Sequence, residues 1–373
     1  MVNRQRLHYF VIVTKELNFT RAAERLHMAH SLLSYQIRQL EKEPEGVKRL
    51  TALRGAGSQA LLLARRAECP RNLPLHHVRR RKHMSEPRDV NPSVWGPDAC
   101  RAAASVTFDN LGEAADLERG LWPESEPLGR HFSVKRTLPR ILDTLDELGL
   151  RATFFVEGLN AELYPEALLE IANSGHELGY HGWRHEYWPN LSLSNEARAL
   201  EQGVYKMDEL GVRPRGFRPP GGRLTPSSPE LLENLGFTHC SPAGLGIGFL
   251  GNLVVLPFEW RLIDAYYYVS RFSDLRETAT GSGEPLSPSH LRKTLSSALQ
   301  GVVRDGGHLT LLFHPFLEEQ DDHFDIMRGV FEELRDLADD GLIWSAPYRD
   351  VVSWVRERPE AFVNGLQLDP TEA

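Results

Sequence analysis

The sequence contains 373 residues, which exceeds one average domain and favours two. Residues 1–90 hold 18 Lys and Arg against 8 Asp and Glu, whereas residues 91–373 hold 25 against 43, so the two parts are expected to have different partners. Three scattered cysteines exclude a disulfide framework, and no run reaches the roughly 18 apolar residues of a membrane span, so we expect a cytoplasmic protein without membrane contacts.

The first segment, residues 1–60, carries apolar side chains at helical spacing up to about residue 43. Within it, "NFTRAAERLHMAHSLLSYQIRQLEKE" predicts a helix, a short turn and a second helix, with Thr20 as the N-cap of the first. This segment resembles the helix-turn-helix of LysR-type transcription regulators, whose words F-T-x-A-A-x-x-L and S-x-x-I-x-x-L-E are nearly intact. The resemblance implies that the second helix contacts DNA through Ser31, Ser34, Gln36 and Arg38.

The following segment, residues 61–100, is an irregular basic linker that Pro70 and Pro74 interrupt. It keeps only traces of the wing and the dimerising helix that LysR-type regulators have next. Two interpretations stay open for residues 1–83. They form a module that binds DNA weakly, mainly through phosphates, or they are a fusion remnant or a wrong start ahead of Met84. The sequence does not predict the oligomeric state.

Residues 101–360 alternate short apolar runs with helical segments of 10–15 residues, and residues 361–373 form a C-terminal tail. Strands that alternate with helices indicate a parallel sheet, and about seven such units indicate a barrel. The chemistry of such barrels gathers where strands end and loops begin. The reactive side chains of this segment do follow its apolar runs: Asp109, His181, His185, Arg218, Asp264 and His314.

Each of these residues also has an ordinary structural explanation. The two histidines of "HGWRH" (181–185) are four residues apart, and on one turn of helix they would face the same side and could share a metal. Arg218 lies in the stiff turn "GFRPPGG", and His314 ends the apolar strand "LLFHP". Asp109 could equally cap the next segment. It is their order and spacing together that favour a site.

That order resembles the polysaccharide deacetylase (NodB-homology, carbohydrate esterase) family over about residues 102–357. The family's five motifs stand here as "TFDN" (107–110), "HGWRH" (181–185), "FRPPGG" (217–222), "FEWRLIDAYYY" (258–268) and "LLFHP" (311–315). The resemblance implies a distorted (β/α) barrel, preceded here by the small all-α fragment. It also implies hydrolysis of an N-acetyl amide, in an oligosaccharide or small molecule, with a divalent metal, Zn²⁺ being the first choice.

Carried onto this sequence, the motifs assign a role to each residue. His181, His185 and Asn110 correspond to metal ligands, and Asp109 to the base that takes a proton from the attacking water. Arg218 would orient Asp109 and keep it ionised, and His314 would protonate the leaving amine with support from Asp264. The residues expected to contact the substrate are Trp183, Pro219, Pro220, Gly221 and Trp260. An aromatic cluster could stack on sugar rings or simply pack in the core: Trp183, Tyr187, Trp188, Tyr266, Tyr267 and Tyr268.

Position 110 departs from the family, which has an aspartate there. Asn110 could ligate a metal through its carbonyl oxygen, Asp109 or Glu113 could supply the missing carboxylate, or the site could lack a metal. The last case would resemble the metal-independent cyclic-amide hydrolases of the allantoinase and imidase kind. A further alternative is a DNA-binding regulator that carries an inactive deacetylase-like domain. Because a metal-free site does not need His185, the metal is the preferred interpretation.

Overall fold

The computed structural model describes residues 95–362 and 365–369, together with Ile12, Ala22 and Arg25. The chain divides into two compact units, Met1–Asp89 and Val90–Ala373. The four candidate DNA contacts, Ser31, Ser34, Gln36 and Arg38, lie outside the described residues.

The second unit is built on a sheet that has nine strands in the described part of the chain. Its central strand β1 (Ala102–Asp109) is buried along its whole length, as expected for a parallel strand that is covered on both faces. The other strands of the sheet are β2 (Ala152–Val156), β3 (Glu177–Tyr180), β4 (Gly216–Phe217), β5 (His239–Cys240), β7 (Gly248–Leu250), β8 (Leu253–Val255), β9 (Gly307–Phe313) and β10 (Ile343–Ser345). Only β7 runs antiparallel to its neighbour among the strands described. Two further short strands, β6 (Gly244–Leu245) and β11 (Gln367–Leu368), pair with each other.

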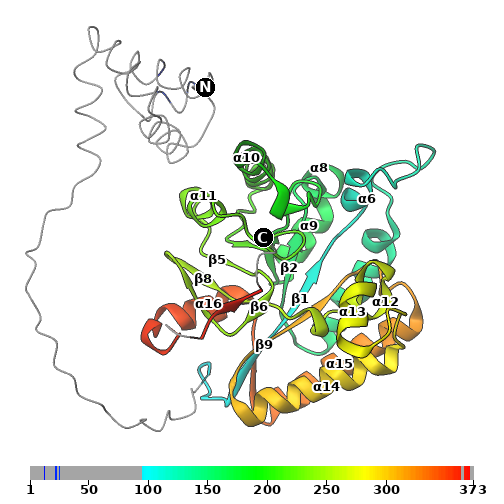
Figure 1. The fold of residues 1–373 in the computed structure, drawn as a ribbon, viewed down its shortest axis with the longest axis vertical. Coiled ribbons are helices and arrows are strands. Elements are labelled where there is room, and N and C mark those ends of the chain that lie inside the picture. The colour runs from blue at the N-terminus through cyan, green and yellow to red at the C-terminus, as the bar shows by residue number, and fades with distance from the viewer. Residues whose placement is uncertain (1–11, 13–21, 23–24, 26–94, 363–364, 370–373) are drawn as a thin grey trace, which may run out of the picture. The chain divides into compact units, whose positions relative to one another are not determined.

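The sheet curls strongly around β1 (Figure 1). One edge of β1 pairs with β9, and the other edge pairs first with β10 and then with β2. A parallel bridge between Ile263 and Leu312 connects the segment after β8 to β9, which brings the two ends of the sheet toward closure. The expectation of a distorted (β/α) barrel is therefore confirmed.

Amphipathic helices cover the sheet. The described helices are α6 (Ala114–Glu118), α7 (Leu138–Glu147), α8 (Asn160–Leu163), α9 (Pro165–Asn173), α10 (Leu193–Glu209), α11 (Ser228–Leu235), α12 (Asp264–Tyr268), α13 (Ser273–Thr280), α14 (Pro288–Asp305), α15 (Asp321–Asp339) and α16 (Tyr348–Arg356). Helix α15 is a clear example of an amphipathic helix, because its buried side chains recur at three- and four-residue spacing. Helix α14 packs beside it (Figure 1). None of the helices in the described residues combines the length and the apolar character needed to cross a membrane.

Candidate active site

Functional side chains gather at the carboxyl ends of the parallel strands. Asp109 ends β1, His181 follows β3, Arg218 follows β4 and His314 follows β9. Together with His185 they line a cavity of about 730 Å³. The strand ends of a parallel barrel meet at one face, so residues distant in sequence come together there.

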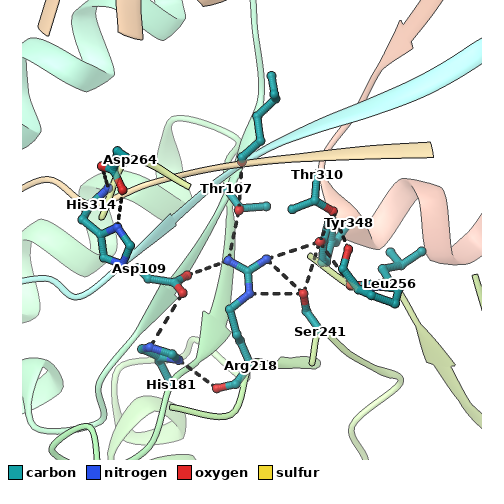
Figure 2. A network of polar contacts seen from close by, with 12 residues as sticks. Thr107, Asp109, His181, Arg218, Ser241, Leu256, Asp264, Thr310, His314 and Tyr348 are labelled. Carbon is teal, nitrogen blue, oxygen red and sulfur yellow. Dashed lines mark hydrogen bonds and ion pairs between the residues drawn. The ribbon is translucent and has the colours of Figure 1, made fainter. Parts of the chain in front are cut away.

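Arg218 is fully buried and holds Asp109 in a fixed position (Figure 2). Its Nη1 donates to Oδ1 of Asp109 at 2.7 Å and to Oγ1 of Thr107 at 3.0 Å. Its Nε and Nη2 donate to Oγ of Ser241, at 3.1 and 3.0 Å, and Nη2 also donates to the hydroxyl of Tyr348 at 3.2 Å. The guanidinium is thereby saturated with acceptors, and Asp109 neutralises its charge. Thr107 lies in the motif "TFDN" without an expected role, and the motifs did not indicate Ser241 or Tyr348.

The two histidines of "HGWRH" do not lie on a helix, so that part of the expectation is wrong. Residues 181–187 form a loop in which Gly182 and His185 have φ angles of +77° and +70°. This left-handed geometry is open to glycine and costly for most other residues. It folds the loop back, so that the rings of His181 and His185 meet edge to face with centroids 4.9 Å apart.

Both imidazoles are held in the neutral form. Nδ1 of His181 donates to the carbonyl oxygen of Arg218 at 2.8 Å, which leaves the lone pair of Nε2 free, 3.7 Å from Oδ2 of Asp109. Burial lowers the pKa of His181 to about 4, although the nearby Asp109 opposes this shift. Burial and the positive charges around it lower the pKa of His185 well below its ordinary value.

His314 is held by Asp264 through two contacts (Figure 2). Nδ1 of His314 donates to Oδ1 of Asp264 at 2.5 Å, and its backbone N–H donates to Oδ2 at 2.6 Å. Asp264 does not end a strand, contrary to the sequence expectation; it begins α12, directly after the bridging Ile263. Behind it lies Glu318, which the motifs did not reveal; burial and the charge of Asp264 raise the pKa of Glu318 well above its ordinary value.

Whether the site can hold a divalent metal depends on the positions of Asn110 and Glu113. Asn110 has a φ of +59°, and its buried Oδ1 has no hydrogen-bond partner among the described residues. Asn110 does not line the cavity. Glu113 is not a substitute ligand, because it accepts from the backbone N–H of Gly129 at 2.7 Å and from the hydroxyl of Tyr164.

The described residues contain no group of three His, Cys, Asp or Glu side chains that could hold a metal. A fit therefore depends on the unpaired amide oxygen of Asn110, added to the neutral nitrogens of His181 and His185. In addition, Nη2 of Arg119 lies 3.3 Å from Nδ1 of His185 and donates to it, which places the proton on Nε2. The neutral donor set fits a weakly held cation, provided that His185 gives up this contact.

Only some of the residues expected to contact the substrate line the cavity. Pro219, Gly221 and Trp260 line the cavity, whereas Trp183 and Pro220 do not. Of the other aromatic residues proposed for sugar stacking, only Tyr187 lines it within the described part of the chain. The remainder serve packing: Trp188, Tyr266 and Tyr267 are buried, and Tyr268 stacks on His323.

Comparison with known proteins agrees with this geometry. Residues 102–240 match the family model described as polysaccharide deacetylase, and residues 4–45 match the helix-turn-helix of bacterial regulatory proteins of the lysR family. Residues 102–240 are thus similar to the polysaccharide deacetylase family, and we call the second unit, Val90–Ala373, the deacetylase domain for that similarity. The deacetylase domain also resembles the crystal structure of a Mycobacterium smegmatis protein with a proposed assignment as polysaccharide deacetylase, with 26% identity and a TM-score of 0.63 over 77% of this chain and 100% of the other.

Two curated relatives of the deacetylase domain are enzymes. A peptidoglycan-N-acetylglucosamine deacetylase of Bacillus cereus is 40% identical over 101 residues, which are 26% of this chain and 33% of the relative. Chitin deacetylase 1 of Saccharomyces cerevisiae is 35% identical over 95 residues, 25% of this chain and 32% of the relative. The chain thus spans about a third of the length of these relatives. The crystal structure of Puue Allantoinase shares the fold at 18% identity, with a TM-score of 0.57 over 74% of this chain and 99% of the other.

Proposed function

We propose that the deacetylase domain hydrolyses the amide bond of an N-acetylated sugar or a related small amide. One observation carries the proposal: Asp109 and His314, each held in place by a charged partner, face the same cavity. Hydrolysis of an amide needs a base for the attacking water and an acid for the leaving amine, because an unprotonated amine leaves poorly. The names of the relatives support an N-acetyl group on a sugar as the substrate.

Asp109 has the geometry of the base. Arg218 binds Oδ1, so the carboxylate cannot rotate, and Oδ2 is left to take a proton from water. Nε2 of His181 lies 3.7 Å from Oδ2, which is too distant for a hydrogen bond. The water oxygen then forms the new bond to the acyl carbon.

His314 has the geometry of the acid. Because a carboxylate only accepts hydrogen bonds, Nδ1 of His314 must carry the proton that it shares with Asp264, and Nε2 remains for the substrate. The charge of Asp264 stabilises the imidazolium form. When the carbon–nitrogen bond breaks, His314 delivers its Nε2 proton to the departing nitrogen, and the products are acetate and a free amine.

A divalent metal, Zn²⁺ as the first choice, is part of the proposal. His181 and His185 would hold it, with Oδ1 of Asn110 as the third donor. When bound, such an ion makes water more acidic and polarises the acyl oxygen.

A second candidate is metal-independent hydrolysis of a cyclic amide. It is favoured by the contact between Arg119 and His185, which places a fixed positive charge where a metal would bind. Its reaction would use the same base, Asp109, and the same acid, His314.

The two candidates predict different products from the purified full chain. N-acetylglucosamine oligomers should release acetate, and the Asp109→Asn and His314→Gln variants should release at least a hundredfold less. A cyclic imide such as hydantoin serves as the comparison substrate. Ring opening without acetate release, unaffected by a chelator, would establish the second candidate instead.

A further inference from the structure

Two arginines that belong to none of the five motifs line the cavity beside His185. Arg119 directly follows α6, and Arg271 lies in the 3₁₀ turn Ser270–Phe272. Nη2 of Arg119 is 3.3 Å from Nδ1 of His185. The charge of Arg119 also acts on Arg271. The two guanidinium groups therefore act on the same part of the cavity.

Neither arginine forms an ion pair within the part of the chain that the structure describes. Three carboxylates besides Asp109 line the cavity, Glu118, Asp274 and Asp369, and none of them pairs with Arg119 or Arg271. The third unmatched cation of the lining is Arg223. By contrast, Asp109 and Arg218 neutralise each other inside the wall.

The backbone that carries Arg271 is firmly held. The buried Arg276 donates from Nη1 to the carbonyl oxygens of Tyr266 and Val269, at 2.6 and 2.9 Å, and from Nε and Nη2 to that of Gly283. Although Arg271 as a residue is exposed, desolvation of its guanidinium and the charge of Arg119 lower its pKa to about 10. The guanidinium group of Arg271 thus stays charged near neutral pH.

We propose that Arg119 and Arg271 form a subsite for an anionic substituent next to the scissile amide. The preferred substrate would then be an N-acetyl compound with a carboxylate, or a phosphate, on the atom beside the one that bears the amide nitrogen. This inference rests on the proposed function, because the amide must lie between Asp109 and His314 for the neighbouring substituent of the substrate to lie near His185.

Three physical reasons support this substrate class. A guanidinium group binds a carboxylate or phosphate through two parallel hydrogen bonds, and such bonds strengthen in a cavity partly shielded from water. Two cations that line the same cavity without ion pairs repel each other, and a bound anion removes that repulsion. The aromatic rings of Trp260 and Phe272 line the same cavity and offer an apolar wall for the uncharged part of the ligand.

The kinetic test compares N-acetylmuramic acid, whose carboxylate belongs to a lactyl ether on the carbon next to the amide-bearing one, with its methyl ester, in which a methyl group replaces that charge. The wild-type full chain should have a kcat/KM about tenfold higher for the acid than for the ester, because one charge-assisted hydrogen bond contributes a factor of about this size. Arg271→Gln should abolish the preference through KM of the acid, and Arg271→Lys should restore part of it. Arg304→Gln is the control, because it removes an equal charge from an exposed residue that pairs with Asp305 outside the cavity. Equal rates on acid and ester in the wild type would overturn the inference, as would an equal loss of kcat for both in Arg271→Gln.

A binding test separates this inference from the proposed function. Calorimetry on the Asp109→Asn full chain measures the affinity for the acid and for the ester without turnover. Tighter binding of the acid that disappears in Asp109→Asn/Arg271→Gln supports the subsite even if the wild type releases no acetate from either compound. Equal affinities for the two compounds overturn it. N-acetylglucosamine 6-phosphate provides the second arm: Arg271-dependent binding of this compound, and not of the acid, would identify the anion as a phosphate and overturn its adjacent placement.

Discussion

Arg218 donates to Asp109 across 109 positions of sequence, through a 2.7 Å hydrogen bond between two buried side chains. The contact fixes one carboxylate oxygen and leaves the other for chemistry. It also makes each residue dependent on the other, because either one alone would be an unpaired charge in the protein interior.

Replacing Arg218 should therefore affect both activity and folding. Arg218→Lys keeps the charge but cannot reach Asp109, Thr107 and Ser241 together, so kcat should fall at least a hundredfold. The variant should also lose about 3 kcal/mol in its free energy of unfolding, measured in urea. Ser241→Ala is the control: it removes the acceptor of two hydrogen bonds from Arg218 but leaves the bond to Asp109, with a loss of about 2 kcal/mol. Near wild-type kcat in Arg218→Lys would show that the orientation of Asp109 is unimportant.

Asp264→Asn should leave the fold intact and impair the acid. The amide cannot stabilise the imidazolium of His314 and can present a donor to Nδ1, which favours the wrong tautomer. We expect kcat to fall by about two orders of magnitude on substrates with a poor leaving amine. Activated esters or anilides, whose leaving groups need less protonation, should lose much less. Equal losses on both kinds of substrate would argue against His314 as the acid.

Asn110→Asp tests the metal directly. If Asn110 is a ligand, a carboxylate in its place should tighten Zn²⁺ binding by about an order of magnitude, as measured by equilibrium dialysis against a chelator. His185→Ala should abolish the binding. If the site is metal-free, the substitution adds a carboxylate beside Asp109, and joint ionisation of two like charges at short range is unfavourable. Activity would then fall near neutral pH. Chelator-insensitive wild-type activity with a mild His185→Ala effect would favour cyclic-amide hydrolysis.

The buried carboxyl group of Glu157 should make the free energy of unfolding depend on pH. It is fully buried; Oε2 accepts from the backbone N–H of Leu111 and from Nδ2 of Asn160, and Oε1 has no partner among the described residues. Burial raises its pKa from 4.5 to about 8, so the folded chain holds the proton more tightly than the unfolded chain. This contribution to stability is complete below about pH 4.5 and is lost as the pH rises toward 8.

Glu157→Gln should remove that dependence. Urea unfolding at several pH values should show that the free energy of unfolding of the variant rises relative to that of the wild type between pH 4.5 and 8. The rise should be at most about 1.4 kcal/mol per pH unit. The exposed Glu360→Gln is the matched control and should run parallel to the wild type. A constant difference between Glu157→Gln and the wild type across this range would refute a buried neutral carboxyl.

The two units of the chain can be tested separately. A chain that begins at Met84 should keep its hydrolytic activity, because the division into units at Asp89 leaves the whole cavity in the second one. The full chain should bind DNA only weakly, with an affinity that falls steeply as salt rises, and the shortened chain should not bind it. Failure of the shortened chain to fold would show that residues 1–83 are integral to the deacetylase domain.

The barrel, the alternation of strands and helices, and the strand ends that carry Asp109, His181, Arg218 and His314 could all be predicted from the sequence. These features depend on local periodicity and on apolar runs, which burial against a single sheet imposes at every element. The departure at Asn110 could also be read directly from one motif.

The contacts that support these residues could not be predicted from the sequence and are seen only in the folded chain. The loop at Gly182 and His185 depends on left-handed backbone angles that the spacing of two histidines does not reveal. The partners of Arg218 come from distant segments, with Tyr348 130 residues away, and Arg119 and Arg271 reach the cavity from outside any motif. Contacts of this kind follow from how the strands and helices pack together, because no local pattern specifies which distant side chain will lie within hydrogen-bond distance.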